Sequence, residues 1–204
     1  IYSTWFAFAA LKDDGSVVTW GYGSYGGDSS GVDLKKDVKE IFSTGSAFAA
    51  LKDDGSVVTW GHNDWGGNSS SVDLENVKEI YSTDFAFAAL KDDGSVVTWG
   101  SSSNGGDSSG VDLKKDVKEI YSTGYAFAAL KDDGSVVTWG HNDMGGNSSE
   151  ADLEEGVERI YSNASVFIAL KKGKVISWGS YIDSSNNILE DKDITKLDSK
   201  YLIN

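Results

Sequence analysis

Two short stretches of this sequence have the spacing of a serine nucleophile. The pentapeptide GDSSG occurs at 27–31 and again at 106–110 and fits G-x-S-x-G, the pattern that exposes a reactive Ser in α/β-hydrolases. That chemistry also needs a strand-to-helix turn, a histidine base and an acid. The equivalent stretches, GNSSS at 67–71 and GNSSE at 146–150, break the pattern. We therefore interpret all four as small polar loops and predict no catalytic residue.

The sequence also gives little support for a metal site. His62 and His141 are the only histidines, and each lies in an HND tripeptide with Asp64 or Asp143. One His-x-Asp pair supplies fewer ligands than a zinc site needs. The chain has no cysteine, so it has no thiolate ligand and no disulfide. Neither a calcium-binding loop nor a glycine-rich phosphate loop is present in the sequence. We predict no metal and no cofactor.

Composition and charge restrict the class of partner. Of the 204 residues 39% are apolar and 12% aromatic, which is typical of a folded globular protein. The sequence has no apolar run of about 18 residues, so we expect no membrane span. A formal charge of −14 opposes binding to nucleic-acid phosphates and favours encounter with a basic protein surface. The alternative is that the acidity only keeps the chain soluble.

The elements that must position any site come from a repeat. The stretch AFAALKDDGSVVTWG at 7–21 recurs unchanged from Ala47, Ala86 and Ala126, and a divergent copy, VFIALKKGKVISWG, follows at 166–179. A period of 39 or 40 residues is typical of propeller blades. We expect one repeat domain over 1–204, with units at 1–40, 41–79, 80–119, 120–159 and 160–192 and a partial sixth at 193–204.

Each unit reads as an antiparallel sheet of three to four strands. VKEIYST, AFAALK and SVVTWG have strand composition, and the Asp-Gly between the last two is a hairpin signal. AFAALK is apolar on both faces, so we expect it to lie between neighbouring sheets, with its small Ala residues near a central axis. The repeated Trp residues are expected to fill the space between sheets: Trp20, Trp60, Trp99, Trp139 and Trp178.

Radial packing protects the edges of such sheets, so the sequence predicts an all-β fold, a β-propeller of five or more blades. A linear β-solenoid is the alternative. The tail at 193–204 either closes the ring against the first unit or shows that the units belong to a longer array. We favour the second, and an incomplete ring predicts self-association.

The stretch at 117–140 resembles the repeat of the regulator of chromosome condensation family. The matching residues are Ala10-Leu11-Lys12, Gly15 and Val17 to Gly21, and their equivalents in the other copies. The resemblance implies a propeller, most often of seven blades. The units are shorter than those of the chromatin-bound eukaryotic member, and none has an insertion that would form its β-wedge.

The short units are closer to a bacterial branch that includes a propeller-type inhibitor of beta-lactamases and GTPase-directed effectors of pathogens. The resemblance implies a protein-binding propeller without a catalytic constellation, at most a guanine-nucleotide exchange factor for a small Ran-like GTPase. A non-catalytic inhibitor, an adhesion module and a glycan-binding module are the alternatives. No signal peptide is visible, and we expect a soluble protein of the cytoplasm or of a host cytosol.

Positions that differ among nearly identical copies are those that the scaffold does not fix. They lie after ST and after WG, at strand ends, where loops usually carry function. By analogy with the inhibitor, Phe6, Phe85 and Tyr125 are the foremost partner-binding candidates. The alternative is that these loops vary freely and that some rings pack on their own sheet. The complete predicted surface is Trp5, Phe6, Tyr22, Tyr25, His62, Asp64, Trp65, Asp84, Phe85, Tyr125, His141, Asp143 and Met144.

Overall fold

The computed structural model describes residues 1–180. The predicted sixth copy at 193–204 and the end of the fifth unit lie outside the described residues. Within 1–180 the protein is all-β apart from four single-turn 3₁₀ helices. The all-β prediction is therefore confirmed.

Each of the five units forms one antiparallel sheet of three strands, in the order of the sequence. The Asp-Gly hairpins join the second and third strands in the first four sheets, as the sequence predicts, and Lys172-Gly173 takes their place in the fifth. The strands are β1 (Tyr2–Ser3), β2 (Ala7–Leu11) and β3 (Val17–Gly21); β4 (Val38–Ser43), β5 (Ala47–Lys52) and β6 (Val57–Gly61); β7 (Val77–Ser82), β8 (Ala86–Lys91) and β9 (Val96–Gly100); β10 (Val117–Ser122), β11 (Ala126–Lys131) and β12 (Val136–Gly140); β13 (Val157–Ser162), β14 (Val166–Lys171) and β15 (Lys174–Gly179).

A 3₁₀ turn follows the third strand of each of the first four sheets and ends at a left-handed glycine. Gly66 shows why the residue must be glycine: its φ is +105°, and an added Cβ would lie 2.5 Å from the ring of Phe87 in the next sheet. These turns are η1 (Gly23–Tyr25), η2 (Asn63–Trp65), η3 (Ser102–Asn104) and η4 (Asn142–Met144).

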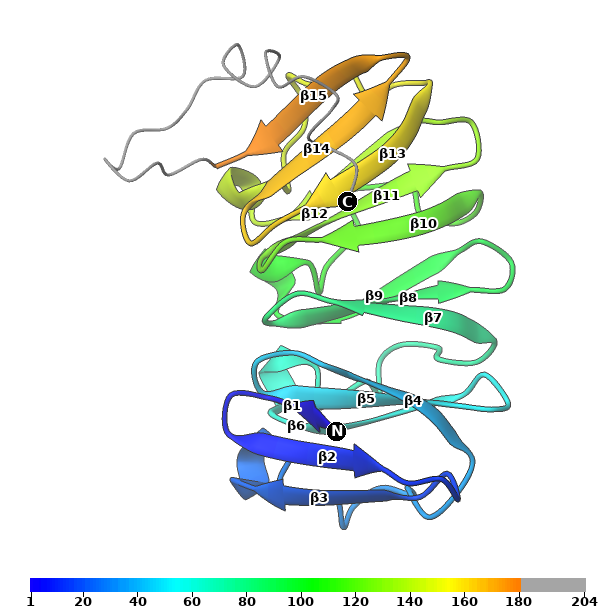
Figure 1. The fold of residues 1–204 in the computed structure, drawn as a ribbon, viewed down its shortest axis with the longest axis vertical. Coiled ribbons are helices and arrows are strands. Elements are labelled where there is room, and N and C mark those ends of the chain that lie inside the picture. The colour runs from blue at the N-terminus through cyan, green and yellow to red at the C-terminus, as the bar shows by residue number, and fades with distance from the viewer. Residues whose placement is uncertain (181–204) are drawn as a thin grey trace.

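The sheets follow one another along the long axis of the molecule, with the first and the fifth at opposite ends (Figure 1). The described strands hydrogen-bond as ladders only within their own sheet, which differs from a solenoid, where strands of successive rungs pair. The first strands contact one another from sheet to sheet, β1 with β4 and so on to β13. The strand nearest the common inner side is therefore the first one. Our placement of AFAALK near the axis was wrong, because this strand is the middle one.

Neighbouring sheets pack through two different faces. Face A of a sheet carries the first and second Ala of AFAALK together with its Leu, and contacts the next sheet. Face B carries Phe, the last Ala and the Trp of VVTWG, and contacts the preceding sheet. Between the second and third sheets, Ala47, Ala49 and Leu51 of face A meet Phe87, Ala89 and Trp99 of face B. Small residues on one side thus receive large rings from the other, which gives close packing.

The Trp residues fill the space between sheets, as predicted, in four of the five copies. Trp99 is 3% exposed and donates its indole N–H to the carbonyl of Gly66 in the preceding sheet, at 3.0 Å. Trp60, Trp139 and Trp178 do the same. Trp20 departs from the prediction, because it is 43% exposed on face B of the first sheet. Among the described residues, no sheet packs against that face.

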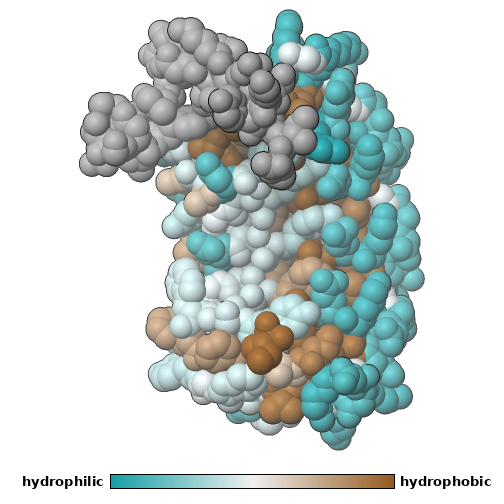
Figure 2. Space-filling model, in the orientation of Figure 1, coloured by the Kyte–Doolittle hydropathy of each residue, from teal (hydrophilic) through white to brown (hydrophobic). Residues whose placement is uncertain are grey.

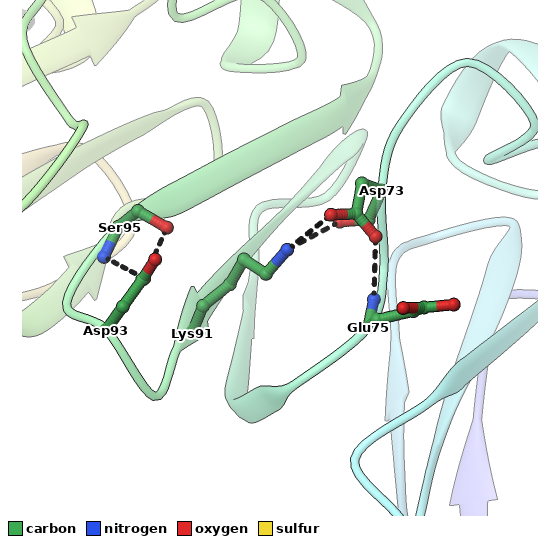
Figure 3. Close-up of polar contacts among 5 residues, drawn as sticks. All are labelled: Asp73, Glu75, Lys91, Asp93 and Ser95. Carbon is green, nitrogen blue, oxygen red and sulfur yellow. Dashed lines mark hydrogen bonds and ion pairs between the residues drawn. The ribbon is translucent and has the colours of Figure 1, made fainter.

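The hairpin turns lie together along one side of the row, and polar bonds hold them. In Figure 3, Lys91 Nζ bonds to Asp73 Oδ2 at 2.7 Å, and Asp93 Oδ1 accepts from the Ser95 backbone and hydroxyl. The Asp–Ser bonds recur in the DDGS turns of the first four sheets. Figure 2 shows strongly hydrophilic side chains gathered on this side and paler ones on the opposite side. The turn side is thus constant and charged.

Candidate partner-binding surface

The two variable segments of each unit meet at the end of the sheet opposite the hairpin turn. In the second sheet, Thr44 Oγ1 accepts from the N–H of Ala47 at 3.0 Å and donates to the carbonyl of Trp65 at 3.0 Å. The N–H of His62 donates to the carbonyl of Ser46 at 2.9 Å. The same Thr and backbone bonds recur in the other three copies of the threonine: Thr4, Thr83 and Thr123. The constant Thr therefore joins both variable segments into one local surface.

Backbone bonds then join these surfaces from sheet to sheet. The first variable residue, which we call the axial position, donates its N–H to the carbonyl of the axial residue in the next sheet, at distances of 2.8–3.0 Å. Trp5 is the one large axial side chain of the described sheets, and it lies over Gly45, the axial residue of the second sheet. The axial residues are Trp5, Gly45, Asp84, Gly124 and Ala164.

The rings of the variable segments form one continuous array across four sheets, which we call the aromatic strip. Trp65 of the second sheet lies 5.9 Å from Trp5 and 5.0 Å from Phe85, between ring centroids. Trp5 also reaches Phe85 of the third sheet at 5.8 Å. Phe85 in turn lies 5.5 Å from Tyr125 of the fourth sheet. The complete strip is Trp5, Phe6, Tyr22, Tyr25, His62, Trp65, Phe85, Tyr125 and His141.

The strip crosses the second sheet because that sheet has small residues at its own variable position. A Cβ added to Gly45 would lie 2.6 Å from the ring of Trp5, so Trp5 covers this glycine. Ser46, at the place of Phe6, Phe85 and Tyr125, is fully buried. Trp5 and Phe6 are 54% and 57% exposed at the outer part of the strip. The result is a supported array of rings with open faces.

The charge at this end of the sheets has one sign. Segments 4–7, 20–30, 43–47, 60–70, 82–86, 99–109, 122–126 and 139–149, which form it, contain no Lys or Arg. They carry Asp28, Asp64, Asp84, Asp107 and Asp143. Asp84 is half-buried at an axial position, and loss of water raises the pKa of its carboxyl above the ordinary value. The strip is therefore aromatic and acidic.

The histidines are members of the strip rather than part of a separate site. The ring of His62 lies between those of Tyr25 and Trp65, with centroid distances of 5.8 and 5.1 Å and tilted planes. The Nδ1 atoms of His62 and His141 are buried and have no hydrogen-bond partner in residues 1–180. Beside His62, an open hollow of about 340 Å³ between the first two sheets is lined by Ser24, Gly61, His62, Asn63 and Asp64.

The structure brings most of the predicted surface residues together. All the predicted rings belong to the strip, and Asp64, Asp143 and Met144 flank it in η2 and η4. Whether they bind a partner stays a prediction. The sequence argument missed the constant Thr residues, and it left Gly45 and Ser46, one of the variable pairs, out of the predicted surface because they are small. A Thr placed before the variable pair in each of the first four copies was the available signal.

The serine of the G-x-S-x-G match has a structural contact. Ser29 Oγ lies 2.9 Å from Thr19 Oγ1, and Ser108 receives the equivalent bond from Thr98. The copies that break the pattern have the same bond, at Thr59–Ser69 and Thr138–Ser148. The bond therefore belongs to the repeat, in agreement with our interpretation of a polar loop.

Two features are absent from the described part of the chain. Across residues 1–180, no three His, Cys, Asp or Glu side chains gather as a set of metal ligands. In the same part of the chain, no helix has the length and apolarity to span a membrane.

Comparison with known proteins identifies the fold. No protein-family model and no curated protein matches the chain. Among solved structures, Prp20p from Saccharomyces cerevisiae, the yeast RCC1, matches 89% of the chain with a TM-score of 0.56 and 20% identity. The fold is an RCC1-like propeller. Human WBSCR16 matches 86% with a TM-score of 0.55 and 19% identity, and the ectodomain of the Physcomitrella patens receptor kinase CR4 matches 89% with 0.58 and 17%.

The chain spans only part of these RCC1-like and related structures. It covers 58% of Prp20p, 60% of WBSCR16 and 52% of the CR4 ectodomain. In the RCC1-like propeller the five sheets are blades, and the aromatic strip runs over one end of blades one to four. The likeness is of fold, since sequence identity is low.

Proposed function

We propose that the protein is a protein-interaction propeller and that the aromatic strip binds a partner through an exposed basic segment. The observation that carries this proposal is the continuity of the strip over four sheets with Asp and no Lys or Arg in the segments around it. Aromatic side chains dominate the binding energy of protein interfaces. Arg and Lys are attracted to ring faces, and the acidic field steers a basic partner toward them.

The strip also has the rigidity that an interface favours. The Thr hydroxyls bond to the backbone carbonyls of Trp65, Tyr25 and their equivalents. Because the backbone is already fixed, it loses little conformational entropy when a partner binds. Tyr22 is 62% exposed, and Trp5 and Phe6 are more than half exposed. Large rings that stay accessible on a fixed backbone support recognition rather than packing within a sheet.

The finer proposal is that the partner is a small Ran-like GTPase, regulated by guanine-nucleotide exchange. Its support is the shared fold with Prp20p, whose structure was described together with its binding to Gsp1p and histones. The test is the release of a fluorescent guanine nucleotide from a Ran-type GTPase. We expect faster release with the protein than with buffer. An unchanged rate would remove exchange and leave non-catalytic binding, as in an inhibitor.

The interaction surface itself is tested with a fluorescent oligo-arginine peptide, with oligo-glutamate as the opposite probe. The wild-type protein should bind oligo-arginine, more weakly as salt increases. Joint replacement of Phe6, Phe85 and Tyr125 by Ala should weaken binding at least tenfold, equivalent to about 1.4 kcal/mol. The control is joint replacement of the exposed loop residues Ser30, Ser70 and Ser109 by Ala, which should bind like wild type.

Thermal unfolding of each variant accompanies the titration. The triple-ring variant should keep a melting temperature close to that of the wild-type protein, because these rings lie outside the sheet-to-sheet clusters. Failure of the wild-type protein to bind oligo-arginine, or equal binding by the triple-ring variant, would refute the proposed basic partner.

A further inference from the structure

A second surface lies on the first sheet, away from the aromatic strip. Face B of this sheet is uncovered: Phe8, Val18 and Trp20 are 45%, 50% and 43% exposed. Phe48 and Trp60, the equivalent rings of the second sheet, are 0% and 4% exposed. Large contiguous apolar faces on soluble proteins mark interaction sites. Within the described residues, the first sheet thus leaves exposed the same face that the other sheets bury.

The uncovered face already has the geometry of a buried one. The rings of Phe8 and Trp20 stack with centroids 5.4 Å apart and planes at 18°. In the second sheet the corresponding values for Phe48 and Trp60 are 5.1 Å and 23°. A docking sheet would therefore meet a face that needs little rearrangement. Within residues 1–180 the indole N–H of Trp20 also has no carbonyl acceptor, whereas each of the four Trp side chains buried between sheets has one.

The four internal interfaces show what fits such a face. In each of them, face B receives a face A on which the small or branched side chains of the middle strand project toward the rings. A second copy of this chain carries a face A on its fifth sheet. There Val166, Ile168 and Leu170 occupy the places of Ala, Ala and Leu, and Ile168 and Leu170 are only half-buried. Both halves of the interface are present on one chain.

We infer that the protein self-associates head to tail, with the fifth sheet of one copy on face B of the first sheet of another. Such an interface joins two different surfaces, so it does not stop at two copies unless the ring closes. The inference is independent of the aromatic strip, which runs over the loop end of the sheets and leaves face B free.

The first experiment is sedimentation velocity of the full chain over a wide range of concentration. The mean mass should rise with concentration past that of a dimer. Val18→Lys places a charge on the exposed face without removing the stacked rings and should give a monomer. Ser71→Lys adds the same charge on an exposed loop and should associate like wild type. A wild-type protein that stays monomeric throughout would overturn the inference.

The second experiment identifies the two surfaces. Ile168→Lys blocks face A of the fifth sheet, and this variant alone should also be monomeric, with thermal unfolding confirming that it is folded. Each blocked variant keeps one intact surface, so an equimolar mixture of Val18→Lys and Ile168→Lys should form a dimer and nothing larger. A mixture that stays monomeric, or an Ile168→Lys variant that associates like wild type, would contradict the head-to-tail arrangement.

Discussion

The first sheet and the third sheet have almost the same sequence but different surroundings. Phe8 and Trp20 are nearly half exposed, whereas Phe87 and Trp99 are 0% and 3% exposed. The stack of the two rings is preserved in both sheets. Local sequence therefore fixes the sheet and its ring pair, and the neighbouring sheet fixes burial. Stability in such an array depends on contacts between nearest neighbours.

The largest expected difference concerns the Trp residues. Trp99→Ala should lower the free energy of unfolding by about 3–5 kcal/mol, because it opens a cavity and leaves the carbonyl of Gly66 without its donor. Trp20→Ala should cost only about 1 kcal/mol, because the ring is already partly in water. Urea unfolding of both variants, at a concentration where the chain is monomeric, measures the two losses. Equal losses would mean that face B of the first sheet is covered in solution.

The Ala residue beside these rings provides a second comparison. Ala89 is fully buried between the second and third sheets, so Ala89→Leu should cost about 1–3 kcal/mol by overpacking. Ala10 has the same place on the uncovered face, where Leu should have almost no effect on the stability of the monomer. Thermal unfolding of the pair tests this. A large loss in Ala10→Leu would show that an unseen neighbour packs there.

The axial positions extend the comparison to the strip. Trp5 lies over Gly45, where an added methyl group would come within 2.6 Å of its ring, whereas at Gly124 the nearest atom would be Asp84 Oδ2 at 3.1 Å. Gly45→Ala should therefore displace Trp5 and weaken oligo-arginine binding severalfold, with little loss of stability. Gly124→Ala is the matched control. Equal effects on peptide affinity would separate Trp5 from the binding surface.

Asp84 is the counterpart of Trp5 in the third sheet, and we expect the smallest effect there. Because loss of water raises its pKa, the folded state is penalised when this carboxyl is ionised. The penalty is absent below the ordinary pKa of 3.8 and complete above the raised pKa of the folded protein. Asp84→Asn should thus slightly raise the melting temperature at neutral pH and not below pH 3.8.

The same variant should bind oligo-arginine less tightly, because it removes an acid from the middle of the strip. Melting curves across pH measure the first effect and peptide titration the second. Unchanged melting at neutral pH together with unchanged affinity would show that Asp84 is neither desolvated nor part of the surface.

The sequence was sufficient for features that depend on local pattern. The Asp-Gly turns, the three strands per unit and the wedges at Trp60 and Trp99 follow from composition and alternation within one repeat. It did not predict that Trp20 is exposed, because Trp20 has the same local sequence as Trp60 and Trp99, and burial depends on the neighbouring sheet. It also placed the wrong strand near the axis, since AFAALK is apolar on both faces both in a middle strand and in an inner one.

For the candidate site, the variable positions could be found from the sequence, but their continuity could not. The strip depends on Trp5 reaching across Gly45 to Phe85, two sheets away. That contact joins residues 80 positions apart through the packing of whole sheets. No spacing within one unit encodes it.

The most direct test of the proposed binding surface uses the seven Trp residues of the chain as probes. Fluorine NMR of protein labelled with 5-fluorotryptophan, assigned with single Trp→Phe variants, would be followed during addition of oligo-arginine. The signals of Trp5 and Trp65, on the aromatic strip, should shift in proportion to bound peptide. The signals of Trp60, Trp99, Trp139 and Trp178, buried between sheets, should stay in place. Peptide binding that leaves Trp5 and Trp65 unmoved would contradict the proposal that the strip is the partner-binding surface.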